Sequence, residues 1–200
     1  VGSEMCIRDR FYPMSQHIGA PCDPLVAVGD HVKVGQKIAE SGAFMSSPIF
    51  ASVSGEVVDI RPMLVPGGAM VKAIVVKNDG KMEEIEGLNE GKDYTTMTND
   101  EILAAIKNAG VVGLGGAGFP TRVKLSPKEP EKIDYIIANC AECEPLLRLH
   151  RQLLEKYAKE IIDTFHMIGE TVGAKEVIIG IKKAYTATIE AVKAVRGQYP

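Results

Sequence analysis

The feature that most constrains this chain is a glycine-rich stretch at residues 113–121, which reads GLGGAGFPT. Four glycines within six positions indicate a loop whose backbone takes positive φ angles or approaches a ligand without an intervening Cβ. A run of bare amide groups near a lysine, here Lys124, can bind a phosphate. Solvent-exposed linkers are polar, whereas Val111, Val112 and Phe119 make this loop partly apolar. The stretch therefore favours a ligand-binding loop over a flexible connector.

A strand and a polar loop follow the glycine-rich stretch. Residues 133–139 read IDYIIAN, which is typical of a buried strand, and they lead directly into CAECEP. Asn139, Glu142 and Glu144 then stand at the carboxyl end of the strand. Open α/β sheets bind nucleotides in the crevice outside the carboxyl ends of their strands. The two motifs together predict a nucleotide site in an α/β domain.

Composition excludes several classes of function. The chain has 200 residues, 46% of them hydrophobic and 24% charged, which is typical of a globular protein with one or two domains. Its net charge of −3 and scattered Lys and Arg residues argue against a nucleic-acid partner. No apolar run approaches the roughly 20 residues that span a bilayer, so we expect no direct membrane span. Four cysteines are too few for a secreted disulfide framework, so we expect a cytoplasmic protein.

Two of the cysteines, Cys140 and Cys143, form a C-x-x-C motif. Such a pair is either a redox couple or half of a zinc site. Zinc takes about four ligands, and the chain has no second pair. We interpret the two residues as reduced thiols that shape the loop, and we predict no metal ligand.

The N-terminal residues have a different character. Residues 1–10 show no periodicity and resemble a translated sequencing adapter. We predict that residues 1–13 are a non-native segment, that Cys6 has no role, and that residues before Phe11 add nothing to the fold.

Residues 14–78 are predicted to be all-β. Short alternating segments are separated by Gly turns, as in VAVGDHVKVGQKI and ASVSGEVV, which indicates a small barrel or sandwich. The pattern resembles the biotinyl/lipoyl-type barrel-sandwich hybrid fold, whose carrier members present a lysine at a hairpin tip. Residues 41–48 occupy that tip here and contain no lysine, so a structural or docking role is favoured. We interpret His17 as a hydrogen-bonding residue without a catalytic role.

Residues 79–97, rich in Gly and Glu, are predicted to be a solvated linker, and residues 98–200 an α/β domain. Thr98 or Asn99 caps a helix that Gly110 ends. A helix over 146–172, a buried strand over 176–181 and a helix over 184–195 complete the alternation. The predicted core stripe of the long helix is Leu153, Tyr157, Ile161, Phe165, Ile168 and Val172.

These motifs identify a family resemblance. GLGGAGFPTRVK followed by IIANCAECEP resembles the flavin-binding region of RnfC, the NADH-side subunit of the Rnf ferredoxin:NAD oxidoreductase, and SQHIGAPCDPLVAVGDHVKVGQKI resembles its N-terminal barrel. The resemblance implies a truncated Rossmann-like domain that binds FMN and NAD(H), with hydride passing between nicotinamide and flavin and no catalytic acid or base. The implied cofactor-binding residues are Gly113, Gly115, Gly116, Ala117, Gly118, Phe119, Lys124, Asn139, Glu142 and Glu144.

The resemblance also implies the protein's partners. They would be other subunits of an electron-transport complex, peripheral on the cytoplasmic membrane, with ferredoxin or a reductase as electron acceptor. The 4Fe–4S clusters of the family would lie in a missing C-terminal region, because the chain has no ferredoxin-type cysteine run. Lys182, Lys183, Ala184 and Tyr185 replace the family's Glu-Asp-Asn-Lys, which leaves open a soluble RnfC-like carrier, such as one serving proline reductase. A barrel interaction module and a scaffold without flavin are further alternatives.

Overall fold

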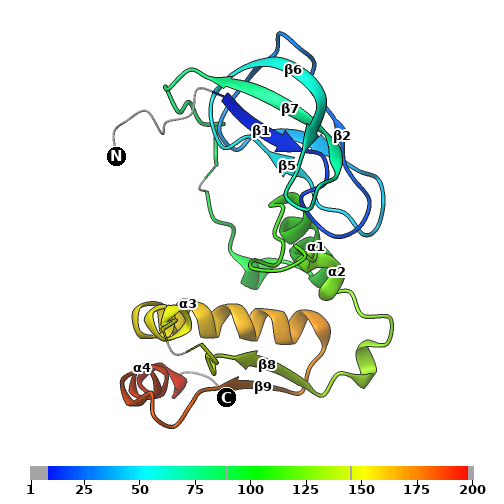
Figure 1. The fold of residues 1–200 in the computed structure, drawn as a ribbon. Helices are drawn as coiled ribbons and strands as arrows, with labels where there is room; N and C mark the ends of the chain where they lie inside the picture. The colour runs from blue at the N-terminus through cyan, green and yellow to red at the C-terminus, as the bar shows by residue number, and fades with distance from the viewer. Residues whose placement is uncertain (1–8, 89, 145, 198–200) are drawn as a thin grey trace. The chain divides into compact units, whose positions relative to one another are not determined.

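The computed structural model describes residues 9–88, 90–144 and 146–197 (Figure 1). The chain divides into two compact units, Val1–Lys124 and Leu125–Pro200. The boundary between the two units follows Lys124, beyond the linker expected at 79–97. The glycine-rich loop therefore belongs to the same unit as the barrel.

The first unit contains two antiparallel sheets. The four-stranded sheet has the order β1-β7-β6-β3, and the three-stranded sheet has the order β2-β4-β5. The strands are β1 (Asp9–Pro13), β2 (Asp23–Pro24), β3 (His31–Val32), β4 (Lys37–Glu40), β5 (Ile49–Phe50), β6 (Gly55–Leu64) and β7 (Met70–Asn78). The expected barrel-sandwich fold is confirmed.

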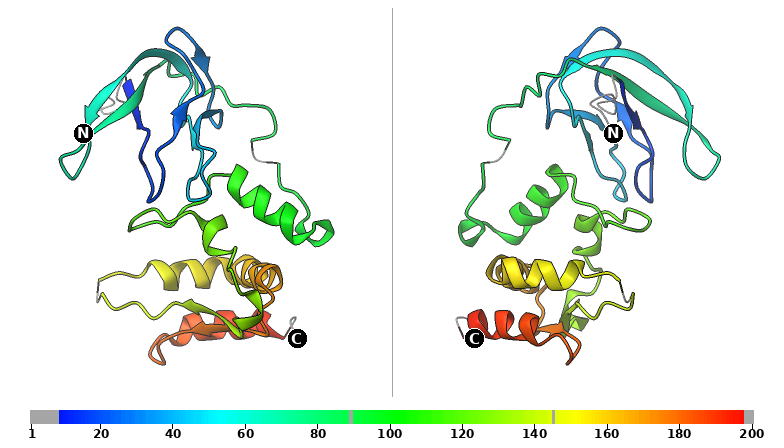
Figure 2. Two further views of the ribbon diagram at one scale, coloured as in Figure 1. Left: turned by 90° about the vertical axis from the view of Figure 1, so that its right-hand side faces the viewer. Right: turned by 60° about the vertical axis from the view of Figure 1, so that its left-hand side comes forward.

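The long β6–β7 hairpin dominates this unit, and β1 lies beside β7 (Figures 1 and 2). Ile74 and Val76 of β7 are two positions apart and both belong to the core, as the period of two along a strand requires. The core of the unit comprises Tyr12, Met14, Cys22, Val32, Ile38, Ala39, Ile49, Ala51, Val53, Val57, Ile74 and Val76.

The expectation for the N-terminal residues is corrected in part. Asp9–Pro13 form β1, which pairs with β7 from Asp9 opposite Lys77 to Pro13 opposite Ala73. Tyr12 is buried in the core. Backbone pairing and one buried ring suffice to order a strand without a clear side-chain period. Residues 1–8, with Cys6, lie outside the described residues.

The predicted linker is partly attached to the barrel. Val34 N–H donates to the Glu83 carbonyl and Ile85 N–H donates to the Val34 carbonyl, at 2.8 and 3.0 Å. Lys33 also forms an ion pair with Glu83 at 2.6 Å. A short 3₁₀ helix, Tyr94–Thr96, precedes α1. The start of the linker is therefore an extension of the barrel surface.

Helix α1 (Asn99–Asn108) begins as predicted. Thr98 is the N-cap residue, and it forms a capping box with Glu101. Gly110 follows the helix with φ +66°, which is the conformation expected of a glycine that ends a helix. The short α2 (Thr121–Lys124) comes directly after the glycine-rich loop.

The second unit is a βαβ arrangement. Strands β8 (Tyr135–Asn139) and β9 (Glu176–Gly180) pair in parallel, with α3 (Leu149–Val172) as the crossover between them. Helix α4 (Thr186–Arg196) packs against α3, and a 3₁₀ helix, Pro130–Lys132, precedes β8. The predicted α/β layering is confirmed, with α3 alongside the strand pair (Figure 1).

Two details of this unit differ from the prediction. The buried face of α3 carries Leu154, Ala158 and Ile162, whereas Leu153 and Tyr157 of the predicted stripe are each 39% exposed. Leucine and isoleucine occupy both faces of this helix, so spacing alone did not select the inner one near its start, where the backbone is also non-helical at Tyr157. At the other end, Val172 of the predicted stripe is buried.

Strand β8 is not fully buried. Ala138 is covered, but Tyr135 and Ile137 are 55% and 64% exposed on the opposite face. Among the described residues, β8 pairs only with β9. No helix in the described ranges combines the length and the apolar character needed to cross a bilayer.

Candidate functional site

The glycine-rich loop is closed at its base by backbone hydrogen bonds. Gly113 N–H donates to the Phe119 carbonyl at 2.9 Å, and Thr121 N–H donates to the Val111 carbonyl at 3.0 Å. These two bonds hold the ends of the loop as a short antiparallel neck. The glycines between them project as one loop with a defined beginning and end.

One face of this loop is open. A Cβ built on Gly115 or Gly116 would meet no protein atom within 4 Å. Gly115 has φ +75°, which disfavours any other residue, whereas Gly116 takes an ordinary backbone conformation. Leu114, which lies between Gly113 of the neck and Gly115, is 97% exposed. A ligand can therefore approach the bare backbone at Gly115 and Gly116.

The other face of the loop packs against the barrel. Ile18 N–H donates a 2.7 Å hydrogen bond to the Ala117 carbonyl. Gly118 is buried, has φ +63°, and a Cβ there would lie 3.0 Å from the Gln16 carbonyl oxygen and 3.1 Å from His17 Cα. Gly115 and Gly116 thus leave one face of the loop open, whereas Gly118 allows a close approach of two backbones.

The remaining predicted residues of this unit lie around the loop. Gly113 and Phe119 form the neck, and Phe119 is 39% exposed. Lys124 is exposed at the end of α2, directly after the loop. Arg122 of the same helix stacks on Phe44 of the barrel tip, with its guanidinium carbon 4.7 Å from the ring centroid. The unit therefore brings together all seven predicted residues from 113 to 124.

The three other predicted residues belong to the second unit. Asn139 ends β8, and its side-chain oxygen accepts a 3.2 Å hydrogen bond from Ala141 N–H. Glu142 is buried and Glu144 is exposed in the loop that follows. Asn139 thus shapes the turn, and Glu144 is the carboxylate that faces solvent.

Glu142 has protein partners on both carboxylate oxygens. One oxygen accepts from His150 N–H in the first turn of α3 at 2.9 Å, and the other accepts from Arg151 Nε at 3.2 Å. Burial alone would raise the pKa of Glu142, but these donors hold its pKa below the ordinary value. The Arg151 guanidinium also lies over the Tyr185 ring at 4.3 Å. Glu142 therefore joins the loop after β8 to α3.

The cysteines of this loop differ in exposure. Cys140 is half-buried and Cys143 is exposed, and both thiols are free. Burial, with the charge of Glu142 nearby, raises the pKa of Cys140. A thiol with a raised pKa is a weak nucleophile at neutral pH.

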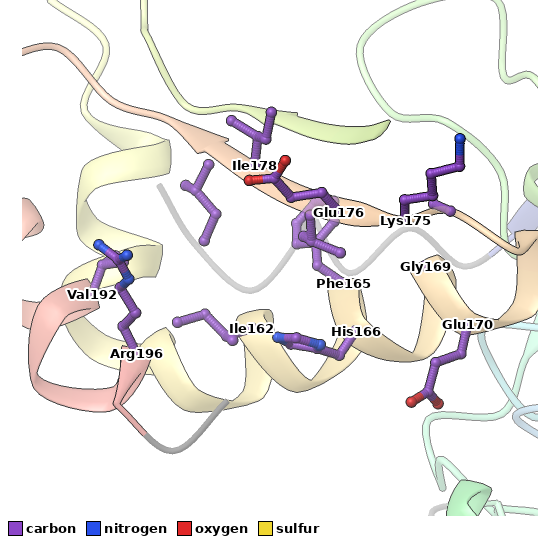
Figure 3. A pocket seen from close by; sticks show the side chains of 13 residues that line it. Ile162, Phe165, His166, Gly169, Glu170, Lys175, Glu176, Ile178, Val192 and Arg196 are labelled. Carbon is purple, nitrogen blue, oxygen red and sulfur yellow. The ribbon is translucent and has the colours of Figure 1, made fainter. Parts of the chain in front are cut away.

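A cavity of about 670 Å³ lies between α3, β9 and α4 (Figure 3). Its walls combine Ile162, Phe165 and Val177 with the charged Glu170 and Arg196. Its lining includes none of the predicted residues of the second unit. We assign no cofactor to it.

The contacts by which residues 16–18 support the glycine-rich loop were not predicted from the sequence. His17 was interpreted as a hydrogen-bonding residue, which is confirmed: its Nε2 lies 2.9 Å from the carbonyl oxygen and 3.1 Å from the amide nitrogen of Ser47. The contact of the following residue, Ile18, with Ala117 had no signal in the sequence.

Comparisons with known proteins agree with this architecture. Residues 4–81 match the RnfC barrel sandwich hybrid domain, and residues 106–200 match the Nuo51 FMN-binding domain. The chain thus joins a barrel-sandwich domain to a domain of the FMN-binding type.

Relatives of known description cover both domains. The C subunit of the proton-translocating ferredoxin:NAD(+) oxidoreductase complex of Clostridium ljungdahlii is 43% identical over 92% of this chain and 40% of the relative. The Na(+)-translocating counterpart of Acetobacterium woodii is 39% identical over 92% of this chain and 42% of the relative. The C subunit of the ion-translocating oxidoreductase complex of Pseudomonas aeruginosa is 36% identical over 94% of this chain and 24% of the relative.

The chain belongs to the RnfC family, as its motifs predicted. It spans about two fifths of the length of the first two relatives and about a quarter of the third.

Proposed function

We propose that this chain is the FMN- and NAD(H)-binding part of an RnfC-type electron-transfer subunit, which moves electrons between NAD(H) and ferredoxin or iron–sulfur acceptors. The observation that carries the proposal is the open backbone at Gly115 and Gly116, inside a stretch that matches an FMN-binding domain. At these two positions the backbone carries no side chain, so it is accessible to a flat ring or a phosphate.

The residues of the loop fit such a cofactor. The neck bonds between Gly113 and Phe119 fix the loop before any ligand arrives, which lowers the ordering cost of binding. Lys124 places a positive charge after the loop, as a phosphate requires. Bound FMN would supply the exchange between hydride transfer and one-electron transfer. The chain's own residues then orient the ligands, and none has to act as a strong acid or base.

We also propose a role for the loop that follows β8 in the second unit. We propose that Asn139 and Glu144 contact the flavin or dinucleotide. Glu142 has both carboxylate oxygens engaged within the protein, so its proposed role is to position that loop.

The proposed partners follow from the names of the relatives, which are subunits of ion-translocating complexes. We infer other subunits of such a complex as partners, a peripheral location at the cytoplasmic membrane, and 4Fe–4S clusters in regions beyond these 200 residues. A soluble RnfC-like carrier and a barrel interaction module receive less support, because these three relatives all belong to multisubunit complexes.

The test uses the complete subunit and the variant Gly116→Val. Gly116 has ordinary backbone angles and no neighbour within 4 Å, so valine should leave the fold intact and obstruct only a ligand. We expect at least a hundredfold weaker FMN binding by fluorescence titration, and loss of NADH oxidation. Gly91→Val is the matched control, because Gly91 also has ordinary angles and no neighbour.

Two results would overturn the proposal. One is a folded complete subunit that binds no FMN, and the other is a Gly116→Val variant with the FMN affinity of the parent protein. Glu144→Gln should retain FMN and slow its reduction by NADH, since the substitution keeps the shape of the side chain and removes its charge.

A further inference from the structure

The barrel tip of this protein contacts another segment of the chain. Residues 41–48 connect β4 and β5, where carrier members of the fold present their lysine. Here the tip binds the segment of residues 16–22. Ala20 N–H donates to the Met45 carbonyl at 2.9 Å, and Ser46 Oγ donates to the Ala20 carbonyl at 3.2 Å.

Glycine allows the close approach of these two segments. Gly19 has φ +118°, and a Cβ there would lie 2.2 Å from the Met45 carbonyl oxygen. Cys22 Sγ donates to the Ser47 carbonyl at 3.2 Å. The segment therefore follows the tip from Met45 to Ser47 with its backbone in contact.

The His17 side chain joins this segment to the barrel tip. It is 8% exposed, and Nδ1 lies 3.2 Å from the Ile18 carbonyl oxygen while Nε2 faces the Ser47 backbone. With the proton on Nδ1, the ring donates to Ile18 and accepts from Ser47 N–H; with the proton on Nε2, it donates to the Ser47 carbonyl. Either neutral tautomer connects residues 17–18 to the tip.

The same residues hold the glycine-rich loop. Ile18 N–H binds the Ala117 carbonyl, and the backbone at Gln16 and His17 lies against Gly118. Before the loop, a Cβ on Gly110 would lie 2.6 Å from the Phe50 ring and 3.2 Å from the Pro48 carbonyl oxygen. Both ends of the loop thus depend on the barrel.

We propose that His17 is a positioning residue for the cofactor loop: it fixes residues 16–18 against the barrel tip so that Ile18 holds Ala117 and leaves Gly115 and Gly116 open. The part of this inference that concerns FMN binding rests on the proposed function. Its structural half, that His17 orders the loop, stands without any cofactor.

The experiment compares His17→Ala, His17→Gln and the parent in the complete subunit. Amide hydrogen exchange without FMN reports the order of residues 113–119 directly. We expect His17→Ala to lower protection there at least tenfold and to weaken FMN binding at least tenfold. Glutamine carries a donor and an acceptor near the position of Nε2, so His17→Gln should recover part of both losses.

Two controls separate positioning from general destabilisation. His31→Ala removes the other described histidine of the barrel, an exposed one that pairs with Asp79, and should change neither readout. Ile74→Val removes a methylene group from the core and should lower global stability without selective loss of protection in the loop.

The outcomes are distinguishable. If the parent binds FMN and His17→Ala keeps both the loop protection and the FMN affinity, the inference is wrong and the proposed function stands. If the parent binds no FMN but His17→Ala still loosens the loop, the proposed function fails and the positioning role remains. Equal loosening by Ile74→Val would also overturn the inference.

Discussion

The backbone N–H of Ile18 donates a 2.7 Å hydrogen bond to the carbonyl oxygen of Ala117, and this bond connects the barrel to the glycine-rich loop. Since both groups belong to the backbone, no side-chain substitution removes the bond directly. Its neighbours, however, can be changed so that the two backbones must separate.

Gly118→Ala should separate them. The new Cβ would lie 3.0 Å from the Gln16 carbonyl oxygen, and alanine would have to take φ +63°. The left-handed conformation alone costs about 1–2 kcal/mol. We expect that loss in urea unfolding together with weaker FMN binding. Gly173→Ala, with φ +73° and no neighbour within 4 Å, is the control that should lose stability alone. Unchanged FMN affinity in Gly118→Ala would contradict the role of this contact.

Glu142→Gln should destabilise the second unit in a pH-dependent way. The folded-state pKa of Glu142 is lowered, so its stabilising effect is complete above the unfolded value of about 4.3 and disappears as pH falls through the lower folded value. The variant should therefore be less stable than the parent at pH 7, and the difference should shrink below about pH 4. Urea unfolding at both pH values, with the exposed Glu144→Gln as control, checks this. A difference that stays constant down to pH 3 would count against the ion pair.

Cys140→Ser should be nearly silent. Because burial raises the pKa of this thiol, it remains protonated at neutral pH and is a poor redox partner for Cys143. We expect FMN content and NADH oxidation within about twofold of the parent, measured on the complete subunit by absorbance. A variant with normal flavin but no activity would instead support a C-x-x-C redox couple.

The barrel should not accept biotin or lipoate. Residues 41–48 contain no lysine, and the backbone of this tip already binds residues 17–22. Intact-mass measurement after co-expression with each ligase should show the unmodified mass. A modified lysine anywhere in the barrel would refute this expectation.

Tyr12→Phe should test the side-chain hydrogen bond that connects β1 to Ser52. The Tyr12 hydroxyl accepts a 2.9 Å hydrogen bond from Ser52 N–H, and its ring is 6% exposed. Removing the hydroxyl should cost about 1 kcal/mol, which corresponds to a Tm lower by roughly 2–8 °C. Thermal unfolding followed by circular dichroism measures it. An unchanged Tm would mean that this hydroxyl contributes little to stability.

Local sequence signals predicted much of this fold. The capping box of Thr98 and Glu101, the stop at Gly110 and the turns between short strands each depend on residues that are neighbours in the chain. The glycine-rich loop was predicted for the same reason, since positive φ angles leave a direct trace in the choice of residue.

Contacts between distant segments were harder to predict. The glycines at 115, 116 and 118 look alike in sequence, but two face open space and one packs against His17. The inner face was misjudged at the start of α3, because Leu153 and Leu154 are equally apolar and only the tertiary structure selects Leu154, whereas the predicted burial of Val172 is confirmed. The role of Glu142 depends on Arg151, which lies in the first turn of a helix that begins without a side-chain cap.

The attachment of the glycine-rich loop to the barrel has a consequence for protein engineering. If residues 79–97 are taken as the domain boundary and the barrel is exchanged for that of a relative, the exchange replaces Ile18 and Gly19 but keeps Ala117 and Gly118. In such a chimera, the two segments that contact each other, residues 16–19 and residues 117–118, would come from different proteins. An exchange made after Lys124 would transfer the barrel and the loop together and would keep the contacts between them.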